Sequence, residues 1–293
     1  MRQGRWPPTL SAPVASSRPA AVVDNGVEAA PAGWRRRLSG RQLPDRICIG
    51  LLLVLSFTLV IVLRDMLTRP LWYNEQWRAW HLSLHRQFLE QLASTNSPMA
   101  AGWVAITKAS ALVLGNREVA LRLPIVLTMP ALAWVGYLLA RRWLGVGASL
   151  LTIVALLANV MVMTYSTQLA PYDLEAACVT AALLLWLQAA DPGRSTRGRW
   201  TRHLAMGTLA MFATPVVFLL GPLLATDLVR SGRRRRWQQV GPTVAAGGLA
   251  VAHLGFYIGQ QTGQSHGPYW NDHFLPRGSL GRVPARSPVR ASR

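Results

Sequence analysis

Long apolar segments separated by short blocks of arginine are the feature of this sequence that most constrains its fold. Each segment approaches the length of about 20 residues that a helix needs to cross a bilayer. The chain is 51% hydrophobic and only 15% charged, whereas soluble domains carry about 25% charged residues. The formal net charge is +19, and its arginines lie between the apolar runs, which is typical of membrane proteins and not of nucleic-acid binders. The sequence therefore predicts an all-α, polytopic membrane protein.

The blocks of arginine also predict on which side of the membrane each loop lies. Arginine is enriched in cytoplasmic loops, and the first block, within 35–46, directly precedes the apolar run 47–63. The amino terminus is therefore expected in the cytoplasm. The same rule places the arginines of 141–142, 194–202 and 230–236 on that side. Further apolar runs lie at 121–137, 148–165, 174–189 and 240–258.

One further apolar segment, 203–229, is longer than a single crossing needs and contains Pro215 and Pro222. A single crossing would place the arginines of 230–236 outside, against the positive-inside rule. Proline removes a hydrogen-bond donor from a helix and clashes with the preceding turn. We therefore expect two short crossings that meet near Thr214, which brings the total to about seven transmembrane helices.

The chain divides into three parts on this pattern. Residues 1–45 are rich in Pro, Ala, Ser and Arg and lack apolar periodicity, which predicts a disordered, basic cytoplasmic tail. Residues 46–260 form the transmembrane module, and 261–293 form an irregular outer segment. Cys48 and Cys178 both lie in apolar stretches, which predicts two buried thiols and neither a disulfide nor a zinc site.

The outer loop 65–120 combines aromatic and charged residues and so differs from the crossings. Apolar residues recur at helical spacing in its first half, namely Trp77, Trp80, Leu84, Phe88 and Leu92. This spacing predicts an amphipathic helix that lies in the membrane interface. The segment 99–114 is apolar but short and contains Lys108, so it is either a crossing or a second interfacial helix. The flat helix is favoured because it leaves the arginines of 141–142 in the cytoplasm.

Acidic residues number only 12, so their positions are informative. Glu75 and the pair Asp173 and Glu175 are expected at one outer face. Ionisable groups beside a span are costly and are often functional, although each could equally be a solvated helix end. Arg117 and Arg122 precede or enter the run 121–137. An arginine at that depth either binds a lipid phosphate or anchors its helix at the interface.

Four short motifs follow one another along the chain. They are Trp72-Tyr73-Asn74-Glu75, Ser97-Pro98-Met99, the stretch 115–124 that ends in Arg122-Leu123-Pro124, and Ala170-Pro171-Tyr172. Their order and spacing, over roughly residues 46–276, resemble the membrane-embedded glycosyltransferases of the C-type fold. The nearest pattern is that of the protein O-mannosyltransferase and aminoarabinose transferase group (glycosyltransferase family 39-like).

This resemblance implies an enzyme that moves a sugar, such as mannose, from a polyprenyl-phosphate donor to a protein or envelope-glycan acceptor at the outer face of the cell membrane. A carboxylate must take the proton of the acceptor hydroxyl, and cations or a divalent metal ion must offset the charge of the departing phosphate. No metal ligands are identified. The resemblance implies catalytic roles for Glu75, Asn74 and Asp173, and substrate-binding roles for Arg117, Arg122, Tyr172 and Pro98.

Two positions depart from the family pattern. The family's first outer acid corresponds to Asn74, and its arginine before Pro-Tyr corresponds to Ala170. An amide cannot act as a base, so Glu75 or Asp173 would take that role. The alternative is a non-catalytic relative that binds polyprenyl lipid or supports a membrane partner. A transporter is a weaker alternative, because polar residues in the apolar runs are few and no paired broken helices are visible.

Overall fold

The computed structural model describes residues 43–84, 99–115, 117–191, 194–233 and 240–262, and every regular element among them is a helix. The helices are α2 (Leu43–Val62), α3 (Arg64–Thr68), α4 (Tyr73–Leu84), α6 (Ala101–Leu114), α7 (Glu118–Val126), α8 (Thr128–Ala140), α9 (Val146–Leu157), α10 (Val160–Ser166), α11 (Tyr172–Ala189), α12 (Thr196–Phe212), α13 (Thr214–Arg233) and α14 (Val240–Thr262). The all-α prediction is confirmed. Nearly all of the predicted tail and of the predicted outer segment lies outside the described residues.

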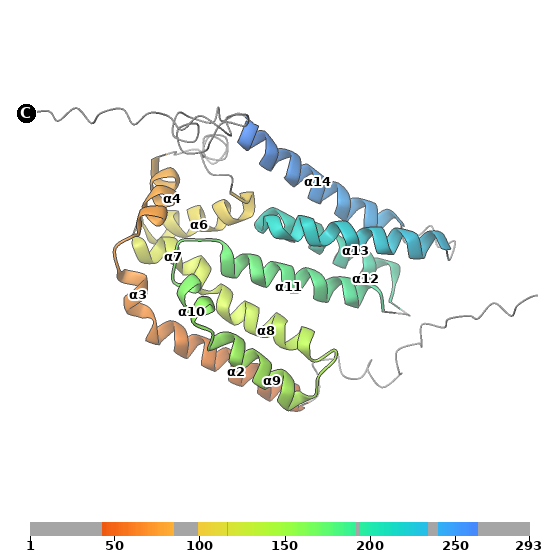
Figure 1. Cartoon of the computed structure of the whole chain (residues 1–293), viewed down its shortest axis with the longest axis horizontal. Coiled ribbons are helices and arrows are strands. Elements are labelled where there is room, and N and C mark those ends of the chain that lie inside the picture. Colours follow the sequence, from red (N-terminus) through yellow and green to blue (C-terminus); the bar gives the residue numbers. More distant parts are fainter. Residues whose placement is uncertain (1–42, 85–98, 116, 192–193, 234–239, 263–293) are drawn as a thin grey trace, which may run out of the picture.

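The long helices run back and forth between two ends of one bundle (Figure 1). The arginine end carries Asp45, Arg141, Asp191 and Arg230, and the Glu75 end carries α3, α4, α6 and the loop 167–171. The described helices make seven passes between these ends. The passes are α2, α7 with α8, α9 with α10, α11, α12, α13 and α14. Arginines of 141–142, 194–202 and 230 thus gather at one end, as the charge pattern predicts.

Four helices are long and apolar enough to cross a membrane, namely Leu43–Val62, Glu118–Ala140, Thr214–Gly232 and Val240–Gly259. The pair α9 and α10 is a fifth candidate, bent by 60° where the Asn159 side chain accepts a hydrogen bond from the Met161 amide and caps α10. Large apolar side chains, such as Leu51, Val54 and Phe218, are exposed on the bundle. A polytopic membrane protein explains that surface, because lipid can cover it.

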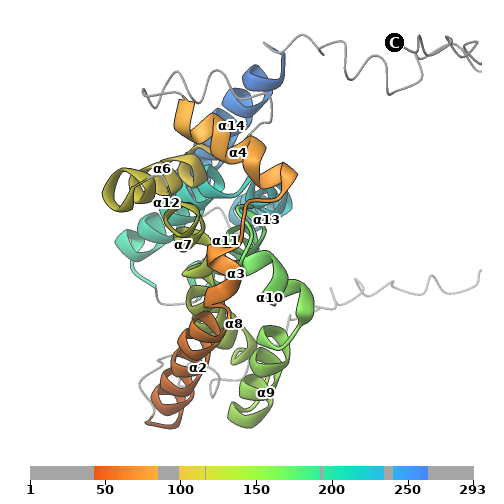
Figure 2. The same ribbon diagram turned by 90° about the vertical axis from the view of Figure 1, so that its left-hand side faces the viewer.

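One local prediction agrees with the structure. α12 ends at Phe212 and α13 begins at Thr214, so the segment 203–229 breaks beside Pro215. α6 has 14 residues, a length of about 21 Å, which is shorter than the roughly 30 Å of hydrocarbon that a crossing must span. Figure 2 shows α6 lying across the direction of α2 and α9. Its position in the membrane interface stays a prediction.

One predicted boundary is wrong. α2 begins at Leu43 and not at residue 46, so it takes in the end of the predicted tail. The reason is a buried ion pair: Asp45 Oδ1 accepts hydrogen bonds from Arg141 Nε at 2.7 Å and from the Tyr137 hydroxyl at 2.8 Å. These bonds hold the first turn of α2 against the end of α8. Both cysteines are free and buried, as predicted.

Small side chains allow close packing of α11, α12, α13 and α14. Their shared core contains Cys178, Ala182, Met206, Ala210, Ala213, Val216, Leu220, Leu224, Ala246 and Ala250. α12 and α14 approach each other closely at Gly207: a Cβ there would lie 2.9 Å from Leu249 Cδ1 and 3.1 Å from Ala246 Cα. Within a membrane, such small residues let helix backbones approach one another.

Gly207→Val is therefore expected to destabilise the bundle by about 1–3 kcal/mol, because a larger side chain must push α12 away from α14. The matched control is Gly221→Val, since a Cβ at Gly221 on α13 meets nothing within 4 Å. Thermal unfolding of both variants in detergent checks this expectation. Equal unfolding temperatures for the two variants would show that α12 and α14 are not packed in this way.

Candidate functional site

Arg122 lies at the centre of the Glu75 end and has no exposed surface. Its guanidinium binds Glu75 in a bidentate manner, with Nε donating to Oε1 at 3.1 Å and Nη2 donating to Oε2 at 2.8 Å. Nη1 also donates to the backbone carbonyl groups of Leu67 at 2.9 Å and Arg69 at 2.7 Å. The planar fork of arginine suits this arrangement. Arg122 thus joins α7 to the turn between α3 and α4.

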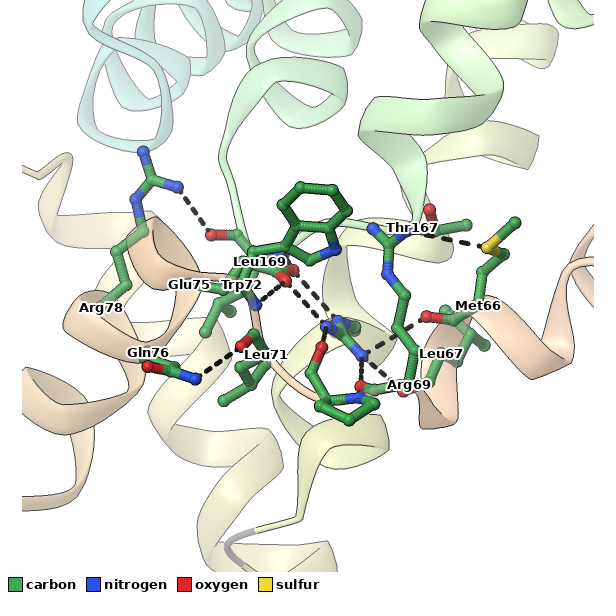
Figure 3. Close-up of polar contacts among 12 residues, drawn as sticks. Met66, Leu67, Arg69, Leu71, Trp72, Glu75, Gln76, Arg78, Thr167 and Leu169 are labelled. Carbon is green, nitrogen blue, oxygen red and sulfur yellow. Dashed lines mark hydrogen bonds and ion pairs between the residues drawn. The ribbon is translucent and has the colours of Figure 1, made fainter.

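Glu75, in the first turn of α4, accepts four hydrogen bonds (Figure 3). Besides the two from Arg122, Oε2 accepts the Trp72 amide at 2.9 Å and Oε1 accepts the Leu169 amide at 2.6 Å. Burial alone raises the pKa of Glu75, but the hydrogen bonds from Arg122 and the two amides outweigh it and hold the pKa below its ordinary value. Its carboxylate is therefore ionised, and both oxygens already accept hydrogen bonds. Glu75 is thus better suited to hold the surrounding segments in place, as an anchor, than to accept a proton.

The loop that precedes α11 is held by α4 from two directions (Figure 3). The Leu169 amide donates to Glu75, and Arg78 Nη1 donates to the Leu169 carbonyl group at 3.1 Å. Glu75 and Arg78 are three residues apart and so lie on the same side of α4. The peptide groups around Leu169 are thereby held in place immediately before Pro171.

Asp173 is the acidic residue that this loop positions, in the first turn of α11 and just ahead of the apolar run 174–189. It is 4% exposed, and its Oδ2 has no hydrogen-bond partner in the described part of the chain. Burial raises the pKa of Asp173 to about 7. A carboxyl group with this pKa can take and release a proton at neutral pH, and such groups cluster at functional sites.

The structure separates the other predicted site residues. Asn74 is exposed on α4, next to Glu75, and Arg117 is exposed at the start of α7. Tyr172 is 46% exposed and makes an edge-on contact with Tyr165, with ring centroids 4.9 Å apart. Pro98 lies outside the described residues. No three His, Cys, Asp or Glu side chains approach one another as a metal site within the described ranges.

A family model described as dolichyl-phosphate-mannose-protein mannosyltransferase matches residues 96–256. The chain belongs to this family. It is a family of glycosyltransferases that use lipid-linked, mannose-type donors, so the resemblance drawn from the short motifs and the predicted enzyme class are confirmed. The matched segment contains Arg122, Tyr172 and Asp173, whereas Asn74 and Glu75 precede it. No curated protein and no solved structure shows a significant match to the chain.

The pairing of Glu75 with Arg122 is the feature of this mannosyltransferase-family site that the sequence did not predict. Both residues were candidates, but for separate tasks. The sequence did indicate that each needed a partner, because a charged side chain in apolar surroundings is buried only when it is paired with an opposite charge. The two residues are 47 positions apart in the chain, so the sequence did not show that each is the other's partner.

Proposed function

We propose that the protein transfers mannose from a polyprenyl-phosphate mannose donor to a hydroxyl group of a protein or envelope-glycan acceptor at the extracytoplasmic face of the cell membrane. The observation that carries this proposal is the buried carboxyl group of Asp173, whose Oδ2 has no partner among the described residues, in a chain of this family. The Leu169 loop, which Glu75 and Arg78 hold, lies directly before it. The arginine end would face the cytoplasm, with the amino terminus, because arginine-rich loops are retained there. The Glu75 end would then face outward.

The reaction needs one proton acceptor, and we assign that role to Asp173. The acceptor hydroxyl oxygen attacks the anomeric carbon of mannose, and the bond from that carbon to the phosphate oxygen breaks. The phosphate leaves with the electron pair of that bond. The hydroxyl proton passes to Asp173, whose pKa of about 7 suits this transfer. Glu75 acts as a positioning residue, because its four hydrogen bonds leave no acceptor site free for a substrate proton.

The charge of the departing phosphate requires a cation near the membrane surface. Arg122 is engaged with Glu75 and with backbone carbonyl groups, so it supports the loop and does not bind the phosphate. Arg117 is exposed at the same end and remains our candidate, with Tyr172 and Pro98 as candidate contacts to the substrate. A divalent metal ion is the candidate cofactor if the arginine is insufficient.

Purified protein in liposomes, supplied with radiolabelled polyprenyl-phosphate mannose and a hydroxyl acceptor, tests this function. We expect label to move to the acceptor in proportion to the protein added. Donors that carry glucose or aminoarabinose in place of mannose identify the sugar. Folded protein that transfers none of these sugars would refute the proposed function.

Asn74 favours a second candidate, a lipid-binding relative without activity, because it stands where the family's first outer acid is expected. Asn74→Asp separates the two candidates. If Asp173 is the base, the wild type is active and Asn74→Asp leaves its rate unchanged within error, since the exposed Asn74 side chain is not the proton acceptor. If loss of that acid silenced the enzyme, the wild type is inactive and Asn74→Asp restores transfer. The same liposome assay measures both.

A further inference from the structure

His253 is a buried polar residue in the described part of the chain, and one of its ring nitrogens is unsatisfied there. It lies in the second half of α14, inside the segment Val240–Gly259 that is apolar enough to cross a membrane. It is 3% exposed, and its Nε2 has no hydrogen-bond partner among the described residues. Buried polar atoms are almost always hydrogen-bonded, so an exception calls for a cause such as a ligand.

The position of His253 on α14 turns it toward the core. Ala246 and Ala250 are buried in the core shared with α12 and α13. His253 and Tyr257 follow them at intervals of three and four residues, which continues the same side of the helix. The rings of His253 and Tyr257 have centroids 6.4 Å apart. Two polar rings therefore extend an otherwise apolar helix face toward the Glu75 end.

Polar side chains connect this helix face to the site described above. Tyr257 interacts electrostatically with Glu175, in the first turn of α11, and Glu175 interacts with Arg78 of α4. Arg78 donates to the Leu169 carbonyl group, and the Leu169 amide donates to Glu75. Electrostatic interactions thus link α14 to α11 and α4, and hydrogen bonds link α4 to the Leu169 loop.

We propose that His253, with Tyr257 on the same helix face, binds the sugar hydroxyl groups of the lipid-linked donor. This inference rests on the proposed function and adds the residues that recognise the donor's sugar. A neutral imidazole can donate or accept a hydrogen bond at Nε2, and sugar hydroxyl groups can do both. The donor is the substrate anchored in the bilayer, and His253 lies on a helix of membrane-spanning character. A hydroxyl group of the donor sugar would supply the partner that Nε2 lacks among the described residues.

The test measures equilibrium binding of two probes to the full chain in detergent micelles, followed by tryptophan fluorescence. The probes are polyprenyl-phosphate mannose and polyprenyl phosphate, which differ only in the sugar. We expect the wild type to bind the mannose form about tenfold more tightly, the effect of one to two hydrogen bonds at a buried site. His253→Leu is expected to bind both probes equally, and His253→Gln, which keeps a hydrogen-bonding group, to retain part of the preference.

Stability is the second measurement, because it separates binding from packing. Leucine in place of an unpartnered buried imidazole removes a polar group that no described residue satisfies, so the unfolding temperature of His253→Leu should stay level or rise. A level or higher temperature together with lost discrimination between the probes supports the inference. If His253→Leu does not fold, His253→Gln provides the measurement. A preference that is reduced but still present, with an unchanged unfolding temperature, supports the inference, whereas an unchanged preference overturns it.

The remaining outcomes distinguish the two proposals. A wild type that prefers the mannose form, with the same preference in His253→Leu, overturns the role of His253 and leaves the mannosyltransferase proposal intact. A wild type that binds both probes equally, while it transfers mannose in liposomes, also overturns recognition of the sugar by His253. A wild type that neither discriminates nor transfers contradicts the proposed function itself. A change confined to the Michaelis constant for the acceptor would assign His253 to the acceptor and overturn the inference.

Discussion

Arg122→Met is expected to destabilise the protein by about 3–5 kcal/mol, because it leaves the Glu75 carboxylate buried without its counter-ion. The backbone carbonyl groups of Leu67 and Arg69 would lose the donor that satisfies them as well. For a chain of this size the loss corresponds to a fall in unfolding temperature of roughly 6–20 °C. Thermal unfolding in detergent, followed by loss of the monodisperse species on size-exclusion chromatography, measures this fall.

Two further variants test whether the loss of stability in Arg122→Met comes from the broken pair with Glu75. Arg117→Met removes an exposed arginine from the start of the same helix, and an exposed substitution of this kind should change stability by no more than about 0.5 kcal/mol. Combining Arg122→Met with Glu75→Gln removes both charges, so the double variant should be more stable than the sum of the two single effects predicts. Strict additivity would show that the two side chains do not interact.

Asp173→Asn is expected to lower the rate of sugar transfer by about 10² to 10⁴ while the protein remains folded, because a general base contributes on that scale. The unfolding temperature should not fall, since the change removes a carboxyl group whose Oδ2 has no partner in the described structure. The liposome transfer assay and thermal unfolding measure the two quantities. Asp65→Asn is the control, because it removes an acid whose side chain is 92% exposed at the same end.

The pH dependence of transfer gives the same assignment a second test. Burial raises the pKa of Asp173 to about 7, and a base must be deprotonated to act. The rate should therefore rise with pH, by about tenfold per pH unit below 7, and level off above it. If Glu75 were the base, its lowered pKa would keep the rate level through this range. Wild-type activity in Asp173→Asn, or a flat profile between pH 5 and 8, would refute the role of Asp173.

The arrangement of the membrane helices could be predicted from the sequence because its causes are local. An apolar run of a given length, a block of arginines and the proline at 215 each act within a few residues. The break between α12 and α13, the gathering of arginines at one end and the short helix α6 follow from these features alone. The start of α2 could not be predicted in this way, since Asp45 is held by Arg141, 96 positions away.

The roles of the acidic residues depended on the tertiary structure. From the sequence, Glu75 and Asp173 are equivalent candidates for a base. The fold brings Arg122 and the amide of Leu169, 94 positions away, to Glu75 and brings no described partner to Asp173 Oδ2. The state of a carboxyl group depends on the charges, hydrogen bonds and burial around it. Those surroundings come from distant segments of the chain. The sequence therefore determined that this is a membrane glycosyltransferase, and the fold decided which carboxyl group is engaged in hydrogen bonds and which has an oxygen without a described partner.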